Sequence, residues 1–240
     1  MDYLFFLLIL IPLLILSAWA SAKVYSTYSA FDGVQNASNM TGYDTAVRLL
    51  QRNGITDISV NRVAGRLSDH YHPTKKQVNL SQSTYGSASI AAVAVAAHEI
   101  GHVMQKESGY VPYKIRTALV PLANIGSRLA LPLILIGILL DIFLFATTGS
   151  LTGQILMYIG IGLYGAATLF MLVTLPVELN ASARAKKMLL EEGILTESEI
   201  PGAKKVLTAA AMTYVASLLI SLVYFFRYLL IVLSFTGRRR

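Results

Sequence analysis

Two histidines and a glutamate stand at a spacing that suits a metal-dependent hydrolase. The segment His98-Glu99-Ile100-Gly101-His102 has the pattern H-E-x-x-H and follows a run of good helix formers from Ala91 to Ala97. Positions i and i+4 lie one turn apart on the same face of a helix, so His98 and His102 can bind one zinc ion together. Glu99 lies beside them, where it can act as a general base toward a water molecule. The pattern predicts the zinc site of a hydrolase, most often a peptidase.

Histidines in an apolar helix are usually ordinary core residues, and short motifs also arise by accident. With four His and seven Glu among 240 residues, the expected number of accidental matches is about 0.002. Half of the chain's histidines lie in this one pattern, so we favour the zinc site over an accidental match.

A third protein ligand must come from elsewhere in the chain, because catalytic zinc sites commonly use His, His and Glu plus water. Glu107 lies five residues past His102, which turns it away from the ligand face. Four other glutamates lie in a polar, solvated stretch: Glu191, Glu192, Glu197 and Glu199. Glu178 is expected to begin a new helix at a membrane boundary, and the small residues after it permit close packing. We therefore expect one Zn²⁺ per chain at His98, His102 and Glu178.

The elements that hold these residues belong to a membrane protein. The chain is 55% hydrophobic and 14% charged, with a mean hydropathy of +0.58, which is too apolar for an ordinary soluble domain. The lack of cysteine leaves only histidine and carboxylate as metal ligands. A net charge of +7 fits basic loops beside anionic lipid, so we expect the bilayer and no nucleic acid as a partner. The predicted fold is an α-helical integral membrane protein with about four transmembrane helices and a zincin-like α+β catalytic domain.

An N-terminal membrane anchor is predicted over residues 1–20, because the eighteen residues from Tyr3 to Ala20 are apolar and long enough to span. The alternative is a cleaved signal peptide, since Ala18-Trp19-Ala20 resembles a cleavage site. However, Asp2 stands where a basic region belongs, and the first positive side chain follows the segment. We favour an uncleaved anchor.

Two further membrane segments are predicted downstream. Residues 129–175 read as a transmembrane hairpin with an uncharged connector at 147–153. Three glycines in its second half indicate close helix packing: Gly160, Gly162 and Gly165. Residues 206–236 read as a C-terminal helix that is at least partly transmembrane, starting in the catalytic domain and ending as a span; a re-entrant end is the alternative.

The water-facing parts are residues 21–128, a zincin-like catalytic region, and residues 176–205, a third-ligand helix and linker. Within the first, Thr41 to Asn53 has the caps and apolar face of a helix. Residues 58–63 and 78–80 alternate like strands, with a loop predicted at 69–73 between them. Strand, loop, strand and motif helix is the order found in zincin peptidases, where an edge strand beside the metal pairs with an extended substrate.

Four residues upstream of the motif are candidates for supporting roles. His70 and His72 flank Tyr71 and would point the same way on an extended chain. Both are also candidate alternative zinc ligands. We expect a surface loop role for both, and the functional option is substrate contact or transition-state hydrogen bonding. Tyr71 and Tyr85 are both candidates for an oxyanion-stabilising hydroxyl, and the sequence does not choose between them.

Taken together, these residues resemble a known family. The H-E-x-x-H motif, with Asp69-His70-Tyr71 upstream and 178–182 downstream, is similar to the bacterial YugP-type neutral zinc metallopeptidases of the membrane. The resemblance covers nearly the whole chain and implies an integral-membrane zinc metalloendopeptidase. More distantly it resembles the heat-shock membrane proteases and CAAX prenyl proteases, gluzincins whose third ligand Glu is followed closely by Ala-Asp. Ser182 stands where those relatives have Asp, so its hydroxyl or Asn180 is expected to orient a ligand.

Charge sets the expected orientation. The segments that hold the predicted ligands carry sixteen of the twenty Lys and Arg residues, and the hairpin connector carries none. We therefore expect a multi-pass protein of the cell membrane with its active site on the cytoplasmic side. The expected substrates are peptides and membrane or membrane-proximal polypeptides. The alternatives are a metal-binding membrane chaperone or adaptor without turnover, and a purely structural membrane protein.

Overall fold

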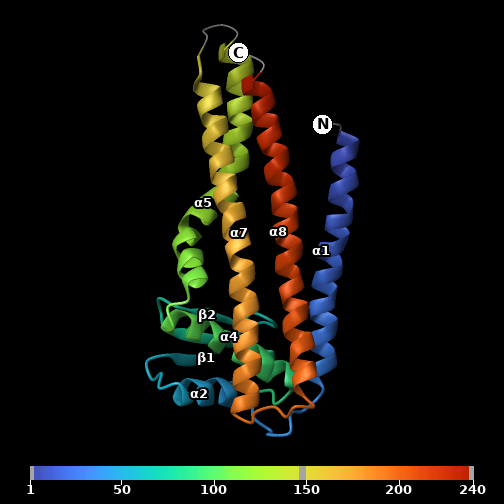
Figure 1. The fold of residues 1–240 in the computed structure, drawn as a ribbon, viewed down its shortest axis with the longest axis vertical. Helices are drawn as coiled ribbons and strands as arrows, with labels where there is room; N and C mark the ends of the chain where they lie inside the picture. The colour runs from blue at the N-terminus through green and yellow to red at the C-terminus, as the bar shows by residue number, and fades with distance from the viewer. Residues whose placement is uncertain (1–2, 146–149, 238–240) are drawn as a thin grey trace. The chain divides into compact units, whose positions relative to one another are not determined.

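The chain forms two compact units in the computed structural model, which describes residues 3–145 and 150–237. The first unit comprises residues 1–16, 114–174 and 214–240, and the second comprises 17–113 and 175–213. Four long helices contribute residues to both units: α1 (Tyr3–Asp32), α5 (Val111–Leu140), α7 (Thr152–Glu191) and α8 (Ile200–Gly237). Figure 1 shows the order of these elements along the chain.

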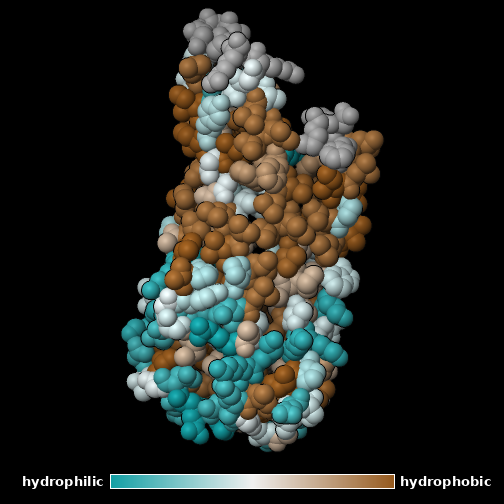
Figure 2. Space-filling view, in the orientation of Figure 1, coloured by the Kyte–Doolittle hydropathy of each residue, from teal (hydrophilic) through white to brown (hydrophobic). Residues whose placement is uncertain are grey.

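The first unit is helical. Besides its parts of α1, α7 and α8, it contains most of α5 (Val111–Leu140), which continues into a short π-helix, η1 (Asp141–Phe145). Within the described residues, four helices are long and apolar enough to cross a membrane: α1, α5 with η1, α7 and α8. Large apolar side chains on them are exposed, among them Leu135, Ile136, Leu169, Leu172 and Leu230, and hydrophobic surface dominates these helices in Figure 2. The protein is therefore a multi-pass membrane protein. The residues of the predicted connector at 147–149 and the basic residues 238–240 lie outside the described residues.

Two of the three hairpin glycines permit close helix packing, as predicted. A Cβ at Gly160 would lie 2.7 Å from a side-chain carbon of Ile134 in α5, and one at Gly165 would lie 3.1 Å from the Phe225 ring in α8. The prediction was wrong for Gly162, where a Cβ would meet no atom within 4 Å. Spacing alone does not distinguish a glycine on the packed face of a helix from one on its open face.

The second unit contains a three-stranded sheet with the order β1-β3-β2. The strand β3 (Gln77–Ser81) pairs in parallel with β1 (Ser59–Val63) and antiparallel with β2 (His70–His72). The predicted loop at 69–73 was wrong at its centre, because 70–72 form β2. Tyr71 pairs with Val78 of β3 and packs against the core, which outweighs the polar character of its neighbours.

Helix α2 (Gly42–Arg52) confirms the predicted helix and both of its ends. The Thr41 hydroxyl accepts a hydrogen bond from the backbone N–H of Asp44, the Asp44 carboxylate accepts one from the backbone N–H of Thr41, and Asn53 caps the other end. This capping box needs only residues three apart, so the local sequence is enough to define it.

The core of the second unit forms around α4 (Ile90–Glu107), which follows the short helix α3 (Gln82–Tyr85). Small and branched side chains cover nearly the whole circumference of α4 and are buried. They pack against residues of α2, β3 and α7, among them Leu49, Val78, Leu80 and Leu189. A helix that is apolar on nearly every side is a buried helix, and burial on most of its surface gives α4 a fixed position.

Three predicted boundaries differ from the structure, and each helix is longer than expected. Helix α1 continues past residue 20 to Asp32, α5 begins at Val111 instead of 129, and α8 begins at Ile200 instead of 206. The boundaries were placed where the apolar runs end. The helical backbone hydrogen bonds continue into the polar residues beyond these runs.

The predicted new helix at Glu178 does not begin there. Helix α7 runs without interruption from Thr152 to Glu191, and Pro176 lies inside it. Proline removes one backbone hydrogen bond and commonly ends a helix, but long apolar helices tolerate it when neighbouring helices support them. Glu178 is therefore an interior residue of a long helix.

Candidate metal centre

Helix α4 supplies both histidines of the motif. The Ser89 hydroxyl caps the start of the helix by accepting a hydrogen bond from the backbone N–H of Ala92. Nine residues later His98 begins the motif, and its ring centroid lies 4.8 Å from that of His102. The side chains of His98 and His102 are 16% and 10% exposed, so the pair lies at the edge of the core, where water can reach it.

Helix α7 brings Glu178 to the two histidines. The Glu178 Oε2 atom lies 3.2 Å from His98 Nε2 and 3.5 Å from His102 Nε2, and the glutamate is buried. The possible ligand atoms of the three residues all lie within 4.8 Å of one another. His98, His102 and Glu178 therefore form a group that can hold a metal ion.

The spacing of these atoms fits zinc. Zinc holds nitrogen and oxygen ligands at about 2.0–2.2 Å in a tetrahedral arrangement, which places neighbouring ligand atoms roughly 3.3–3.6 Å apart. The two distances from Glu178 Oε2, 3.2 and 3.5 Å, are close to this spacing. Two neutral imidazoles and one carboxylate are also the donor set of many catalytic zinc sites, which leave the fourth position open.

A close approach of α4 to α7 makes this geometry possible. A Cβ at Gly101 would lie 2.6 Å from the backbone oxygen of Ala181, a distance that real Cβ atoms do not show. Glycine within the motif thus lets the α4 backbone lie directly against α7, three residues beyond Glu178. Gly101 was not among the expected functional residues, although it lies between the two histidines in the sequence.

Gln105 connects His102 to α7. Its Oε1 atom lies 3.0 Å from His102 Nδ1, and its Nε2 atom donates to the backbone oxygen of Val177 and to Asn180 Oδ1 at 2.7 and 3.0 Å. Gln105 is fully buried. If Nδ1–H of His102 donates to Gln105, Nε2 is left with the lone pair that a metal ligand needs. Gln105 was not among the expected functional residues, although a polar residue three positions after a ligand histidine lies on the same helix face.

Ser182 and Asn180, both expected to orient a ligand, lie at different distances from the histidines. The Ser182 hydroxyl lies 3.2 Å from His98 Nδ1. The Asn180 amide contacts Gln105 and also accepts a hydrogen bond from Arg184 Nε at 2.9 Å. Ser182 is thus in direct contact with a histidine, and Asn180 reaches His102 only through Gln105.

Glu99 lies next to the histidines but is not part of the ligand group. It is only 7% exposed, and no hydrogen bond to its carboxylate is found among the described residues. Burial raises the pKa of the Glu99 carboxyl, although the positive charge of His102 and His98 would lower it. A buried carboxylate beside a metal site, not engaged by other side chains, can exchange a proton with a molecule bound there.

The upstream candidates lie on or near the sheet. Both His70 ring nitrogens have partners outside the ligand group, Ser68 O at 2.9 Å and Asn79 Nδ2 at 3.1 Å. His72 Nδ1 accepts a hydrogen bond from the Lys75 backbone. The described contacts therefore place neither histidine with His98, His102 and Glu178.

The two tyrosine candidates are partly buried and pack against the core of the second unit. The Tyr71 hydroxyl is buried without a hydrogen-bond partner among the described residues, and burial raises the pKa of Tyr71 to about 12, with Tyr113 and Glu107 adding to the rise. The Tyr85 ring packs against Tyr43 with centroids 4.8 Å apart. Neither is brought into contact with the ligand group by the described interactions.

Known proteins resemble this chain over nearly its whole length. A family model described as "putative neutral zinc metallopeptidase" matches residues 6–233. The chain is similar to "Putative membrane protease YugP" of Bacillus subtilis (strain 168), with 42% identity over 230 residues that cover 95% of this chain and 97% of that protein. No solved structure matches the chain. The chain thus belongs to the family of "putative neutral zinc metallopeptidases".

Proposed function

We propose that the protein is a zinc endopeptidase that hydrolyses peptide bonds of membrane or membrane-proximal polypeptides, and that its second unit is a zincin-like catalytic domain. The observation that carries the proposal is the convergence of His98, His102 and Glu178, within 4.8 Å of one another, beside the buried carboxylate of Glu99. A purely structural metal site uses four protein ligands and needs no such base.

The proposed chemistry divides between the metal and the chain. Zinc, when bound by His98, His102 and Glu178, supplies a Lewis acid that polarises a carbonyl and acidifies water. Glu99 takes the proton from the attacking water and later returns it to the leaving amine, so one carboxyl serves as base and then as acid. Gln105 and Ser182 hold the two imidazoles by their Nδ1 atoms while Nε2 faces the ligand group.

An edge strand supports a peptide as the substrate. In the sheet order β1-β3-β2, strand β2 is at an edge, and it contacts α4. The free edge of a strand can pair with an extended peptide backbone, which gives affinity without strong sequence selectivity. We propose that an extended segment binds along the three residues of β2, a length that terminal or unfolded segments can supply.

The membrane helices support substrates at the membrane. Glu178 lies in α7, which is itself long and apolar enough to cross a bilayer. A loop, tail or loosened segment of another membrane protein would meet such a site more readily than a folded soluble protein. The sixteen Lys and Arg residues in the ligand-bearing segments favour the cytoplasmic side.

The variant Glu99→Gln tests this function. It should retain zinc and lose peptide cleavage by roughly 10²–10⁴-fold, because the proton acceptor is gone. Zinc content by elemental analysis, and cleavage of an unfolded membrane polypeptide by the purified full chain, give the two readouts. Glu107→Gln is the matched control, since Glu107 is an exposed glutamate at the end of the same helix.

Three results would contradict the proposal. Equal cleavage by Glu99→Gln and the unmodified chain would remove Glu99 as the base. Zinc binding without cleavage of any membrane polypeptide by the unmodified chain would favour a metal-binding chaperone or adaptor. Proteomics of cells carrying Glu99→Gln should show accumulation in the membrane fraction, and accumulation of soluble proteins alone would overturn the substrate class.

A further inference from the structure

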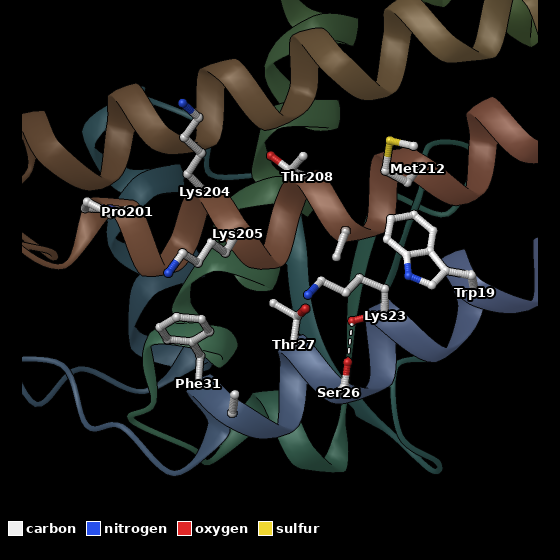
Figure 3. A pocket seen from close by; sticks show the side chains of 12 residues that line it. Trp19, Lys23, Ser26, Thr27, Phe31, Pro201, Lys204, Lys205, Thr208 and Met212 are labelled. Atoms are coloured by element: carbon white, nitrogen blue, oxygen red, sulfur yellow. Dashed lines mark hydrogen bonds between the residues drawn. The ribbon is translucent and has the colours of Figure 1, made fainter. Parts of the chain in front are cut away.

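A cavity lies within the second unit, and none of the three metal-centre residues lines it. It has a volume of about 700 Å³ and lies between the C-terminal part of α1 and the N-terminal part of α8. Its lining is mainly apolar and includes Trp19, Ala30, Phe31, Ala209 and Met212. Figure 3 shows these two helices with the side chains between them.

The charged groups of this cavity are all positive. Lys23, Lys204 and Lys205 line it, and no aspartate or glutamate does. In Figure 3 the ammonium groups of Lys23 and Lys205 lie in the gap between α1 and α8, whereas Lys204 points away from α1. The Lys205 ammonium lies 5.9 Å from the centre of the Phe31 ring, a contact that holds the group in place without neutralising it.

The nearest acidic residues in the chain have other partners. Asp32 accepts a hydrogen bond from Ser89 at 3.3 Å and pairs with Arg66 at 3.8 Å. Glu199 accepts hydrogen bonds from the backbone N–H groups of Ala37 and Thr196 at 2.7 and 2.8 Å. Among the described residues, the lysines of the cavity have no carboxylate partner, so the cavity has uncompensated positive charge.

The two inward lysines mark the ends of uncharged helix segments. Lys23 directly follows the twenty residues 3–22 of α1, and Lys205 directly precedes the twenty-one residues 206–226 of α8, and neither segment contains a charged residue. About 20 apolar residues cross the hydrocarbon core of a bilayer. By length and composition, both lysines stand where a helix would leave the hydrocarbon, which is the level of lipid headgroups. Trp19, one turn before Lys23 and half exposed, is typical of this level.

We propose that this cavity binds the headgroup of an anionic phospholipid, with its phosphate between Lys23 and Lys205. An anion is favoured because the cavity offers cations and no carboxylate. A lipid is favoured over free phosphate because the apolar lining and the volume far exceed what a phosphate ion needs. Basic cavities between membrane helices recognise such headgroups. The site is separate from the metal ligands and does not depend on the proposed catalysis.

The only tryptophan of the chain lines the cavity, so its fluorescence reports on the site. We would reconstitute the full chain in phosphatidylcholine vesicles and replace part of the lipid with brominated phosphatidylglycerol or brominated phosphatidylcholine, since bromine quenches a nearby indole. Quenching of Trp19 should show a preference for phosphatidylglycerol of roughly thirtyfold, from two ammonium contacts. The double variant Lys23→Gln/Lys205→Gln should lose this preference.

Two control variants and one competing anion make the result specific. Lys23→Arg/Lys205→Arg should keep the preference, and Lys75→Gln/Lys186→Gln, with the same change of charge outside the cavity, should keep it too. Unchanged zinc content shows that each variant is folded. Equal quenching by the two brominated lipids, or a preference that survives Lys23→Gln/Lys205→Gln, would overturn the proposal. Displacement of brominated phosphatidylglycerol by inorganic phosphate, but not by chloride at the same ionic strength, would overturn the lipid assignment in favour of a free anion.

Discussion

At the scale of single residues, Gln105 holds His102 and α7 together. Replacing it with alanine leaves His102 Nδ1 without its acceptor and the Val177 carbonyl without its donor. Zinc affinity should fall about 10–100-fold, as it does when groups that orient metal-binding histidines are lost. Competition with a fluorescent chelator measures the affinity. Gln51→Ala, an exposed glutamine on α2, is the control; an unchanged affinity in Gln105→Ala would show that His102 needs no such support.

Two substitutions of Ser182 are expected to change the zinc affinity in opposite directions. Ser182→Ala removes the oxygen that lies 3.2 Å from His98 Nδ1 and should weaken zinc binding. Ser182→Asp places a carboxylate there, which makes the imidazole a better donor and should restore or strengthen binding. The same chelator competition compares the two variants. If both weaken binding equally, Ser182 serves packing and not the orientation of His98.

The motif residues were predictable at this scale, and their partners only in part. His98, Glu99 and His102 follow from the H-E-x-x-H pattern and helical periodicity, which are local properties. Glu178 lies 80 residues after His98 and was inferred from its surroundings in the sequence. The contacts of Gln105 with Val177 and Asn180 depend on how two distant helix faces meet, which no local pattern specifies.

At the scale of elements, the distance between α4 and α7 decides whether the ligands can meet. Gly101→Ala would place a methyl group 2.6 Å from the backbone oxygen of Ala181, so one helix has to move. We expect a loss of about 1–3 kcal/mol in stability, together with weaker zinc retention. The midpoint of thermal unfolding and the zinc content are the measurements. Gly162→Ala is the control, because its Cβ would meet no atom within 4 Å, and a similar loss in both variants would exclude a specific role for Gly101.

Elements were predictable where their signals are local. The caps of α2, Thr41 and Asn53, are side chains that act within one turn, and the sequence located both. The continuation of α7 through Pro176 and the formation of β2 at 70–72 were missed. In both cases tertiary packing outweighs a local preference. Pro176 disfavours a helix, and the polar residues around Tyr71 disfavour a strand.

At the scale of the whole molecule, the orientation in the membrane is the main prediction. The native chain has no cysteine, so Ser150→Cys and Lys75→Cys each provide a single thiol. In intact cells, a thiol reagent that does not cross membranes should label position 150 and not position 75, because basic segments stay inside. Labelling of position 75 after permeabilisation is the control for accessibility. The reverse pattern would place the metal centre outside.

The separation of the ligands along the chain has a consequence for the order of events during synthesis. His98 and His102 are made early, whereas Glu178 follows only after α5, η1 and the first part of α7. A growing chain therefore contains two ligands of the centre for as long as the hairpin is being made, and two histidines hold zinc less firmly than the complete set. The metal centre becomes complete only when the third and last ligand has left the ribosome. On the proposed function, the chain therefore gains its activity toward other polypeptides only after Glu178 has been made.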